Sequence, residues 1–228
     1  MIIDATLISL KVVIIAVIIT LILSLLAVIF IGQSKRKWMK FLEVFLIFPM
    51  FIPPSAIGYL ILIVLGKNGF IGKMLNENFD ISIIFTVSAA VIASVIVTIP
   101  IMYQNIKVAV LSIDDEIKDS ARDCGANELI VFTKIVLPLA KRGILNGVLL
   151  SFARAFGEFG ATILVAGNIP GKTQTLPMAM YYAIERNNNA DAVKILIIVL
   201  SVAAFLMTIY SYLTNKDNNK VKLQKLKA

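Results

Sequence analysis

Long apolar runs separated by short polar segments dominate this sequence of 228 residues. A helix that crosses a membrane needs about 20 consecutive, mainly apolar residues. Five runs reach that length, at about residues 12–31, 44–65, 81–103, 144–166 and 192–213. The pattern therefore predicts an all-α polytopic membrane protein with about five transmembrane helices. The first run is full length and lacks a basic start, so we expect an uncleaved helix rather than a signal peptide.

Prolines interrupt the second run at Pro49, Pro53 and Pro54. Proline removes a backbone donor and clashes with the preceding turn, so three prolines in one span exclude a regular helix. The broken helix could line a translocation path with its freed backbone, or it could be a kink that only helps packing. Both alternatives stay open at this point, and Pro53 and Pro54 are candidate path or gate residues.

Composition agrees with a chain embedded in a lipid bilayer, because 59% of its residues are hydrophobic and only 16% are charged. The sequence contains no histidine, which excludes Ser-His-Asp catalysis and histidine-ligated metals. Its one cysteine, Cys124, excludes an internal disulfide. We expect a protein without catalytic residues, bound metal or cofactor. The formal charge of +8 is explained by basic cytoplasmic loops, so we do not expect nucleic-acid binding.

Lysine and arginine are concentrated in alternate connections, which the positive-inside rule places in the cytoplasm. We expect the N-terminus outside and the C-terminus inside, in one transmembrane domain over residues 1–228. A long cytoplasmic loop at about 107–138 and a basic tail at about 214–228 belong to this domain. The basic residues on the predicted inner side are Lys35, Arg36, Lys37, Lys40, Lys107, Lys118, Arg122, Lys134, Lys141, Arg142, Lys216, Lys220, Lys222, Lys225 and Lys227.

A segment on the predicted outer side, GNIPGKT at residues 167–173, is similar to the loop that binds ATP phosphates. That loop needs a glycine five positions before the glycine of its Gly-Lys-Thr end. Ala166 occupies this position, so the segment is not a nucleotide site. It could help to receive an external binding protein, or it could be a plain connecting turn. Its candidate contact residues are Gly167, Pro170, Gly171 and Thr173.

The long cytoplasmic connection contains DSARDCGANELIVFTKIVLP at residues 119–138. This segment resembles the cytoplasmic loop of ABC importer permeases, which has E-A-A, three residues, Gly, nine residues and I-x-L-P. Asp and Ser replace the first two motif residues, and the spacing is complete. The matching positions are Asp119, Ser120, Ala121, Gly125, Ile135, Leu137 and Pro138.

The same connection is amphipathic, independently of that resemblance. Apolar residues recur at helical spacing on one face, and charges of both signs occupy the other face. Acidic side chains on the polar face disfavour an anionic lipid surface, so a protein partner suits this segment better. We expect the apolar face to comprise Ile113, Ile117, Ala121, Gly125, Leu129, Phe132 and Val136.

The segments FARAFGEFGATILVAGNIPGKTQTLPMAMY and PPSAIGYLILIVLGKNGFIG extend the resemblance over nearly the whole chain, to bacterial molybdate importer permeases. The resemblance implies an ABC importer permease fold in the cytoplasmic membrane, with a coupling helix that docks on an ATPase. It also implies a homodimer, two copies of a separate ATPase that uses ATP, and an external molybdate-binding protein. Sulfate and tungstate permeases share the ARxxGEFG element, so these oxyanions remain alternative substrates. A passive channel or secondary transporter is the alternative class.

Two ionisable residues, Arg154 and Glu158, fall inside the fourth apolar run. If the helix is continuous, they share one face near the middle of the membrane. Ionisable groups at that depth usually face a bundle interior or a water-filled cavity. They could shape an anion path or gate, or they could form a structural ion pair beside the small residues Gly157 and Gly160. Both interpretations stay open.

Overall fold

The computed structural model describes residues 1–32, 34 and 36–225, with side chains up to Tyr212. The described part contains helices and no strand, so the all-α prediction is confirmed. Lys35 and Lys227, which were assigned to the inner side, lie outside the described residues. In chain order the α-helices are α1 (Ile2–Ala27), α2 (Lys37–Ile47), α3 (Pro54–Leu65), α4 (Phe70–Phe79), α5 (Val87–Leu111), α6 (Asp115–Asp123), α7 (Glu128–Ile130), α8 (Leu137–Phe156), α9 (Gly160–Ala166), α10 (Leu176–Glu185) and α11 (Asn189–Lys225).

Four continuous helical segments in the described part are long and apolar enough to cross a membrane: Ile2–Gly32, Val87–Leu111, Glu128–Phe156 and Asn189–Tyr212. The second predicted span is instead a bent pair, Lys37–Phe51 and Pro54–Leu65, with 116° between its halves. Counting this pair as one span gives five, in agreement with the hydrophobic pattern. The absence of a regular helix there is also confirmed, because Ile52 and Pro53 have extended backbone angles.

Several predicted boundaries were wrong. The third span begins at Val87 rather than near residue 81, because Thr86 caps α5 by accepting a hydrogen bond from the Ala89 N–H. The fourth span was expected at about 144–166, yet the continuous helix covers Glu128–Phe156 and is broken at Gly157. The last helix continues to Lys225 through most of the residues predicted as a tail.

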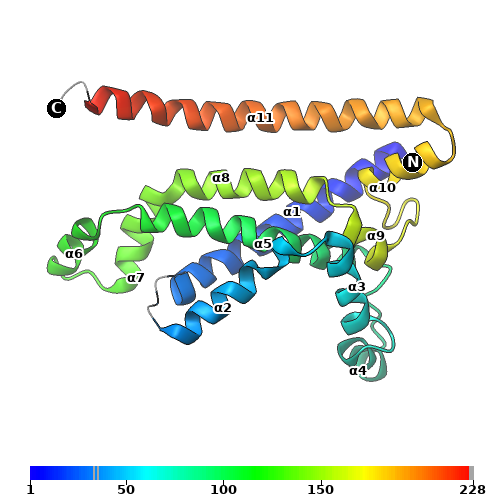
Figure 1. Cartoon of the computed structure of the whole chain (residues 1–228), viewed down its shortest axis with the longest axis horizontal. Helices are drawn as coiled ribbons and strands as arrows, with labels where there is room; N and C mark the ends of the chain where they lie inside the picture. Colours follow the sequence, from blue (N-terminus) through cyan, green and yellow to red (C-terminus); the bar gives the residue numbers. More distant parts are fainter. Residues whose placement is uncertain (33, 35, 226–228) are drawn as a thin grey trace.

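Helix α5 forms the centre of the bundle and packs against α1 and α8 (Figure 1). Its side chains Met102, Tyr103 and Ile106 are completely buried. Two glycines of α8 allow the close approach of α5, because a Cβ atom at Gly143 would lie only 2.3 Å from the Ala109 side chain. Small residues and long apolar side chains therefore alternate along this contact.

Two polar pairs join neighbouring helices. The Thr20 and Thr98 hydroxyls of α1 and α5 are 3.1 Å apart and share a buried hydrogen bond. Lys107 of α5 forms an ion pair with Glu43 of α2, which ties the first half of the bent span to the bundle. These pairs satisfy groups that would be costly to bury alone.

The two ends of the molecule carry different parts of the chain (Figure 1). Helix α6 and the C-terminal end of α11 lie at one end, whereas the N-terminus, α9 and α10 lie at the other. Helix α11 runs along one side and contacts α10 and α8. This arrangement positions two regions for closer description: the α6–α8 connection and the broken helices at the opposite end.

Candidate coupling loop and translocation path

Helix α6 carries three of the seven motif residues, Asp119, Ser120 and Ala121. None of its residues is buried, and it lies apart from the packed centre of the bundle (Figure 1). The following turn contains Gly125 with φ +87°, a left-handed conformation that favours glycine, and a Cβ atom there would meet nothing within 4 Å. Glycine is therefore required here by the backbone conformation and not by close packing.

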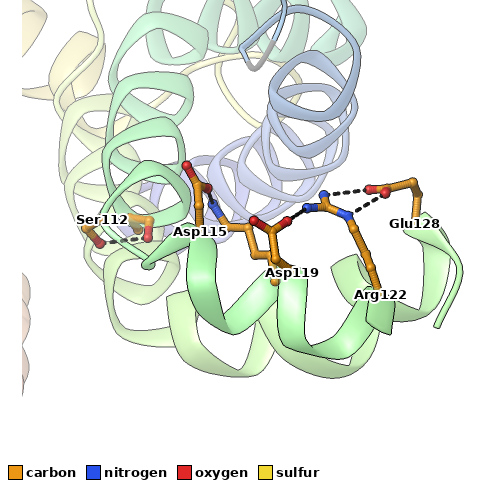
Figure 2. Close-up of polar contacts among 7 residues, drawn as sticks. Ser112, Asp115, Asp119, Arg122 and Glu128 are labelled. Atoms are coloured by element: carbon orange, nitrogen blue, oxygen red, sulfur yellow. Dashed lines mark hydrogen bonds and ion pairs between the residues drawn. The ribbon is translucent and has the colours of Figure 1, made fainter. Parts of the chain in front are cut away.

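An ionic clamp links α6 to α7 across this turn (Figure 2). Nε and Nη2 of Arg122 lie 2.7 and 3.1 Å from the two carboxylate oxygens of Glu128, a bidentate pair. Nη1 of Arg122 also lies 2.5 Å from Asp119 Oδ1. The sequence placed Arg122 among the basic residues of the inner side and gave no role to Glu128. The available signal was a basic residue in the last turn of one helix and an acidic residue in the first turn of the next.

The clamp has a defined dependence on pH. Hydrogen bonding from Arg122 lowers the pKa of the Glu128 carboxyl. The hydrogen bonds to Glu128 and then Asp119 raise the pKa of the Arg122 guanidinium. Because the pKa of Glu128 is lowered in the fold, the clamp contributes fully above the ordinary glutamate pKa of about 4.3 and is lost as the pH falls through the lowered value. Across neutral pH it is unchanged.

The predicted apolar face divides into an inner and an outer part. Ile113 and Val136 are buried against the bundle, as is Val131. Ile117 and Leu129 were expected on the same face, yet they are 44% and 71% exposed. The expectation of one apolar face is corrected only in that part of it packs against the bundle, while Ile117 of α6 and Leu129 of α7 remain exposed. Exposed apolar side chains beside a rigid ionic clamp are typical of a docking surface.

The end of the motif is continuous with a membrane helix. The cytoplasmic connection was expected at about 107–138, but α5 extends to Leu111 and the next continuous helix begins at Glu128. The π-helical turn Val131–Val136 joins α7 to α8, and Ile135 lies within it. Leu137 and Pro138 form the first turn of α8, the place expected for a proline. A displacement of α7 is therefore passed to α8 without an intervening flexible loop.

The breaks in the second and fourth spans lie against each other. A Cβ atom at Gly58 of α3 would lie 2.8 Å from the backbone of Ala161 in α9. A Cβ atom at Gly160 would lie 3.2 Å from Pro54 Cβ. The structure thus brings Pro54 and Gly160, which are far apart in the sequence, to one place. The spacing of residues gave no signal for this contact, since it depends on how two spans pack.

Arg154 and Glu158 form an ion pair, which was one of the two interpretations left open by the sequence. Their expected position on one helix face was wrong, because α8 ends before Glu158. Helix α8 ends at Phe156, Gly157 is its C-cap, and Glu158 precedes α9. Nη1 of Arg154 lies 2.7 Å from Glu158 Oε2, and Oε1 accepts a hydrogen bond of 2.8 Å from the Ala161 N–H. The Glu158 side chain is 1% exposed, whereas that of Arg154 is 32% exposed. The carboxylate therefore caps the short helix and pairs with a partly exposed arginine.

The loop between α9 and α10 is ordered by its own hydrogen bonds. Thr173 Oγ1 donates to the Gly167 carbonyl over 3.2 Å and accepts from the Ile169 N–H over 3.3 Å. Thr173 is therefore buried, while Pro170 and Gly171 are exposed at the tip. Gly167 has φ +65° and packs against Phe85, so it too belongs to the inner part of the loop. Of the four candidate contact residues, only Pro170 and Gly171 face outward.

A separate cavity of about 680 Å³ lies between α2, α3 and α5. Its lining is apolar and includes Phe45, Ile61 and Ile96. An oxyanion needs hydrogen-bond donors or positive charge, so this cavity does not suit one. Within the described residues, no group of three or more His, Cys, Asp and Glu side chains could hold a metal ion.

Comparison with known proteins shows that this chain is similar to membrane subunits of binding-protein-dependent transport systems. The family described as binding-protein-dependent transport system inner membrane component matches residues 24–216. YvgM of Bacillus subtilis (strain 168) is 40% identical over 193 residues, which cover 81% of this chain and 85% of that protein. The molybdenum transport system permease protein ModB of Escherichia coli (strain K12) is 36% identical over 211 residues, 92% of either chain.

A solved structure supports the same architecture. The crystal structure of an amino acid ABC transporter with histidines matches with a TM-score of 0.61 over 96% of this chain and 93% of that chain. The two sequences are 18% identical in this comparison, so the match shows the fold alone. The bundle described above is therefore an ABC transporter permease fold.

Proposed function

Because the chain belongs to the family of binding-protein-dependent transport system inner membrane components, we propose that it is the membrane-spanning permease of an ATP-driven molybdate importer. The evidence for molybdate as the substrate is the similarity to ModB, which extends over 92% of both chains. Tungstate and sulfate are the alternative substrates, because no feature of charge or size in the structure separates these tetrahedral oxyanions.

The permease works as part of a larger complex in this proposal. Two copies of the chain form a homodimer with the path at their two-fold interface. Two copies of a separate ATPase bind the α6 end, and an external molybdate-binding protein docks at the opposite end. The N-terminus is outside and the C-terminus is cytoplasmic. The opposite positions of α6 and the α9–α10 loop in Figure 1 support this assignment.

In this proposal, movement of the ATPases is transmitted to the membrane spans through the continuous structure from α6 to α8. When the ATPases close on ATP, they move α6 and, through the Arg122–Glu128 clamp, α7. The helix from Glu128 to Phe156 carries this movement to the far end of the fourth span. There it shifts the Arg154–Glu158 pair and the contact between α9 and α3, which opens the path outward. Release of the ATP products returns the path to its inward-facing state.

The permease itself performs no bond chemistry. Its contribution to the path is positive potential at Arg154, which is partly exposed while its partner Glu158 is buried. The carboxylate offsets part of that charge, so that an oxyanion is attracted without being held tightly. The freed backbone near Pro53 and Pro54 and the small residues Gly157 and Gly160 give the path room to change shape.

ATP hydrolysis by the reconstituted complex tests this function. The chain is co-purified with its ATPase, placed in liposomes, and supplied with the external binding protein either empty or loaded with molybdate, tungstate or sulfate. We expect stimulation by molybdate-loaded protein that disappears when residues 119–125 are replaced by a Gly/Ser segment. Stimulation by the sulfate-loaded protein alone would contradict molybdate as the substrate but would leave the proposed coupling mechanism in place. Failure of any ATPase to co-purify would overturn the mechanism.

A further inference from the structure

A small cavity lies inside the bundle, where α1, α5, the end of α8, α9 and the residue before α10 meet. Its volume is about 10 Å³. Its polar lining consists of Ser9, Ser94, Glu158, Thr162 and Thr175. Each of these residues is no more than 5% exposed. Five buried polar side chains from separate parts of the chain therefore converge on one small space.

Three hydroxyls at this cavity lack a protein partner. Ser94 Oγ, Thr162 Oγ1 and Thr175 Oγ1 have no hydrogen-bond partner among the residues that the structure describes. Ser9 Oγ accepts a hydrogen bond of 2.7 Å from the Leu176 N–H, which leaves its own O–H free to donate. Buried polar groups are nearly always paired with protein or ordered water, so these hydroxyls require an explanation.

The charge at the cavity is already balanced. Glu158 pairs with Arg154 through Oε2 and caps α9 through Oε1. A cation would therefore find no free negative charge, and an anion would face the carboxylate. A small neutral molecule that both donates and accepts hydrogen bonds fits the remaining groups. The volume of about 10 Å³ is that of roughly one water-sized probe, the lower limit for a bound water.

We propose that one water molecule occupies this cavity and bridges the hydroxyls of Ser94, Thr162 and Thr175. A buried water commonly makes about three hydrogen bonds, which matches the three unpaired hydroxyls. The water joins α5 and α9 to the start of α10, and it lies beside the Glu158 carboxylate. It thereby fixes the ordered outer loop and the short helix α9 to the centre of the bundle. The proposal is independent of the transported substrate.

Removing one hydroxyl gives opposite results for an occupied and an empty cavity. In Thr162→Val the side-chain shape is kept and the hydroxyl is lost. If water is bound, it loses a partner, and we expect the thermal unfolding midpoint of the full-length chain in detergent to fall by about 2–5 °C. If the cavity is dry, the change removes an unpaired buried hydroxyl and the midpoint rises, which would overturn the proposal. Thr208→Val, at an exposed threonine of α11, is the matched control.

A second variant and a direct measurement keep the test decisive. Ser94→Ala should also lower the midpoint, and the double variant should lose less than the two separate losses combined, because both residues bind the same water. Strict additivity would contradict a shared ligand. A density map of the full chain at about 2 Å resolution should show one peak between these hydroxyls. If the thermal unfolding midpoint is higher in sodium chloride than in choline chloride, the cavity binds a cation and not water, which would overturn the proposal.

Discussion

At the scale of single residues, Glu158 has two functions that amino-acid substitutions can separate. Glu158→Gln keeps an oxygen that can cap α9 but removes the charge that holds Arg154. We expect the assembled chain to persist in the membrane and molybdate-stimulated ATP hydrolysis to change by about 2–10-fold. Glu158→Ala also removes the cap, which costs about 0.5–2 kcal/mol, and should reduce the amount of folded chain. Loss of the Gln variant from the membrane to the same extent would instead assign the pair a purely structural role.

The contact between the two broken spans requires glycine at position 58. Gly58→Ala places a Cβ atom 2.8 Å from the Ala161 backbone, so α3 and α9 must separate. Overpacking of this kind costs about 1–3 kcal/mol, and the unfolding midpoint should fall accordingly. Gly157→Ala is the control, because its Cβ would meet only the Ala153 carbonyl at 3.7 Å. Equal effects of the two substitutions would show that the close approach at Gly58 does not matter for stability.

Residue spacing indicated the motif positions and offered the Arg154–Glu158 pair as one of two interpretations, because both depend on neighbours in the sequence. It could not predict that Gly160 meets Pro54, since that contact arises only when two spans pack. It also missed the partnership of Arg122 with Glu128, which depends on the direction of the turn at Gly125.

At the scale of elements, the rigidity of the α6–α7 connection is the feature that coupling requires. Glu128→Gln breaks the bidentate pair with Arg122 but leaves the Arg122–Asp119 pair in place. We expect stimulation of ATP hydrolysis by the loaded binding protein to fall several-fold at pH 7, while basal hydrolysis is kept. Glu116→Gln on the same exposed helix is the matched control, since its side chain takes no part in the clamp. Equal stimulation in the two variants would contradict a role for the clamp.

The apolar runs identified the membrane spans because lipid imposes a minimum length on each of them. They did not locate the break at Gly157, because apolar residues continue before Arg154 and after Glu158, so the two charges left the run unbroken. The helical spacing of Leu129, Phe132 and Val136 indicated an amphipathic helix in this segment, but it did not show that this helix continues directly into α8. Hydropathy therefore reports which segments enter the membrane, and tertiary contacts decide where helices begin and end.

At the scale of the whole molecule, the position of Cys124 provides a test of orientation. It is the only cysteine in the sequence, and it is exposed in the turn after α6. A membrane-impermeant maleimide should label it in inside-out vesicles and not in intact spheroplasts, and bound ATPase should slow the labelling. In a Cys124→Ser background, Lys172→Cys at the exposed loop tip should show the reverse accessibility. Labelling of Cys124 in intact spheroplasts would place α6 outside and contradict the proposed topology.

The measurement that tests the central claim most directly is uptake of labelled molybdate by proteoliposomes. They contain the chain and its ATPase, with the loaded binding protein outside and ATP either present or absent inside. The account predicts accumulation that requires internal ATP and is abolished by Leu129→Asp, because that residue is 71% exposed on the proposed docking surface. Uptake that proceeds equally without ATP, and equally in the Leu129→Asp variant, would identify a passive channel or secondary transporter and contradict the account.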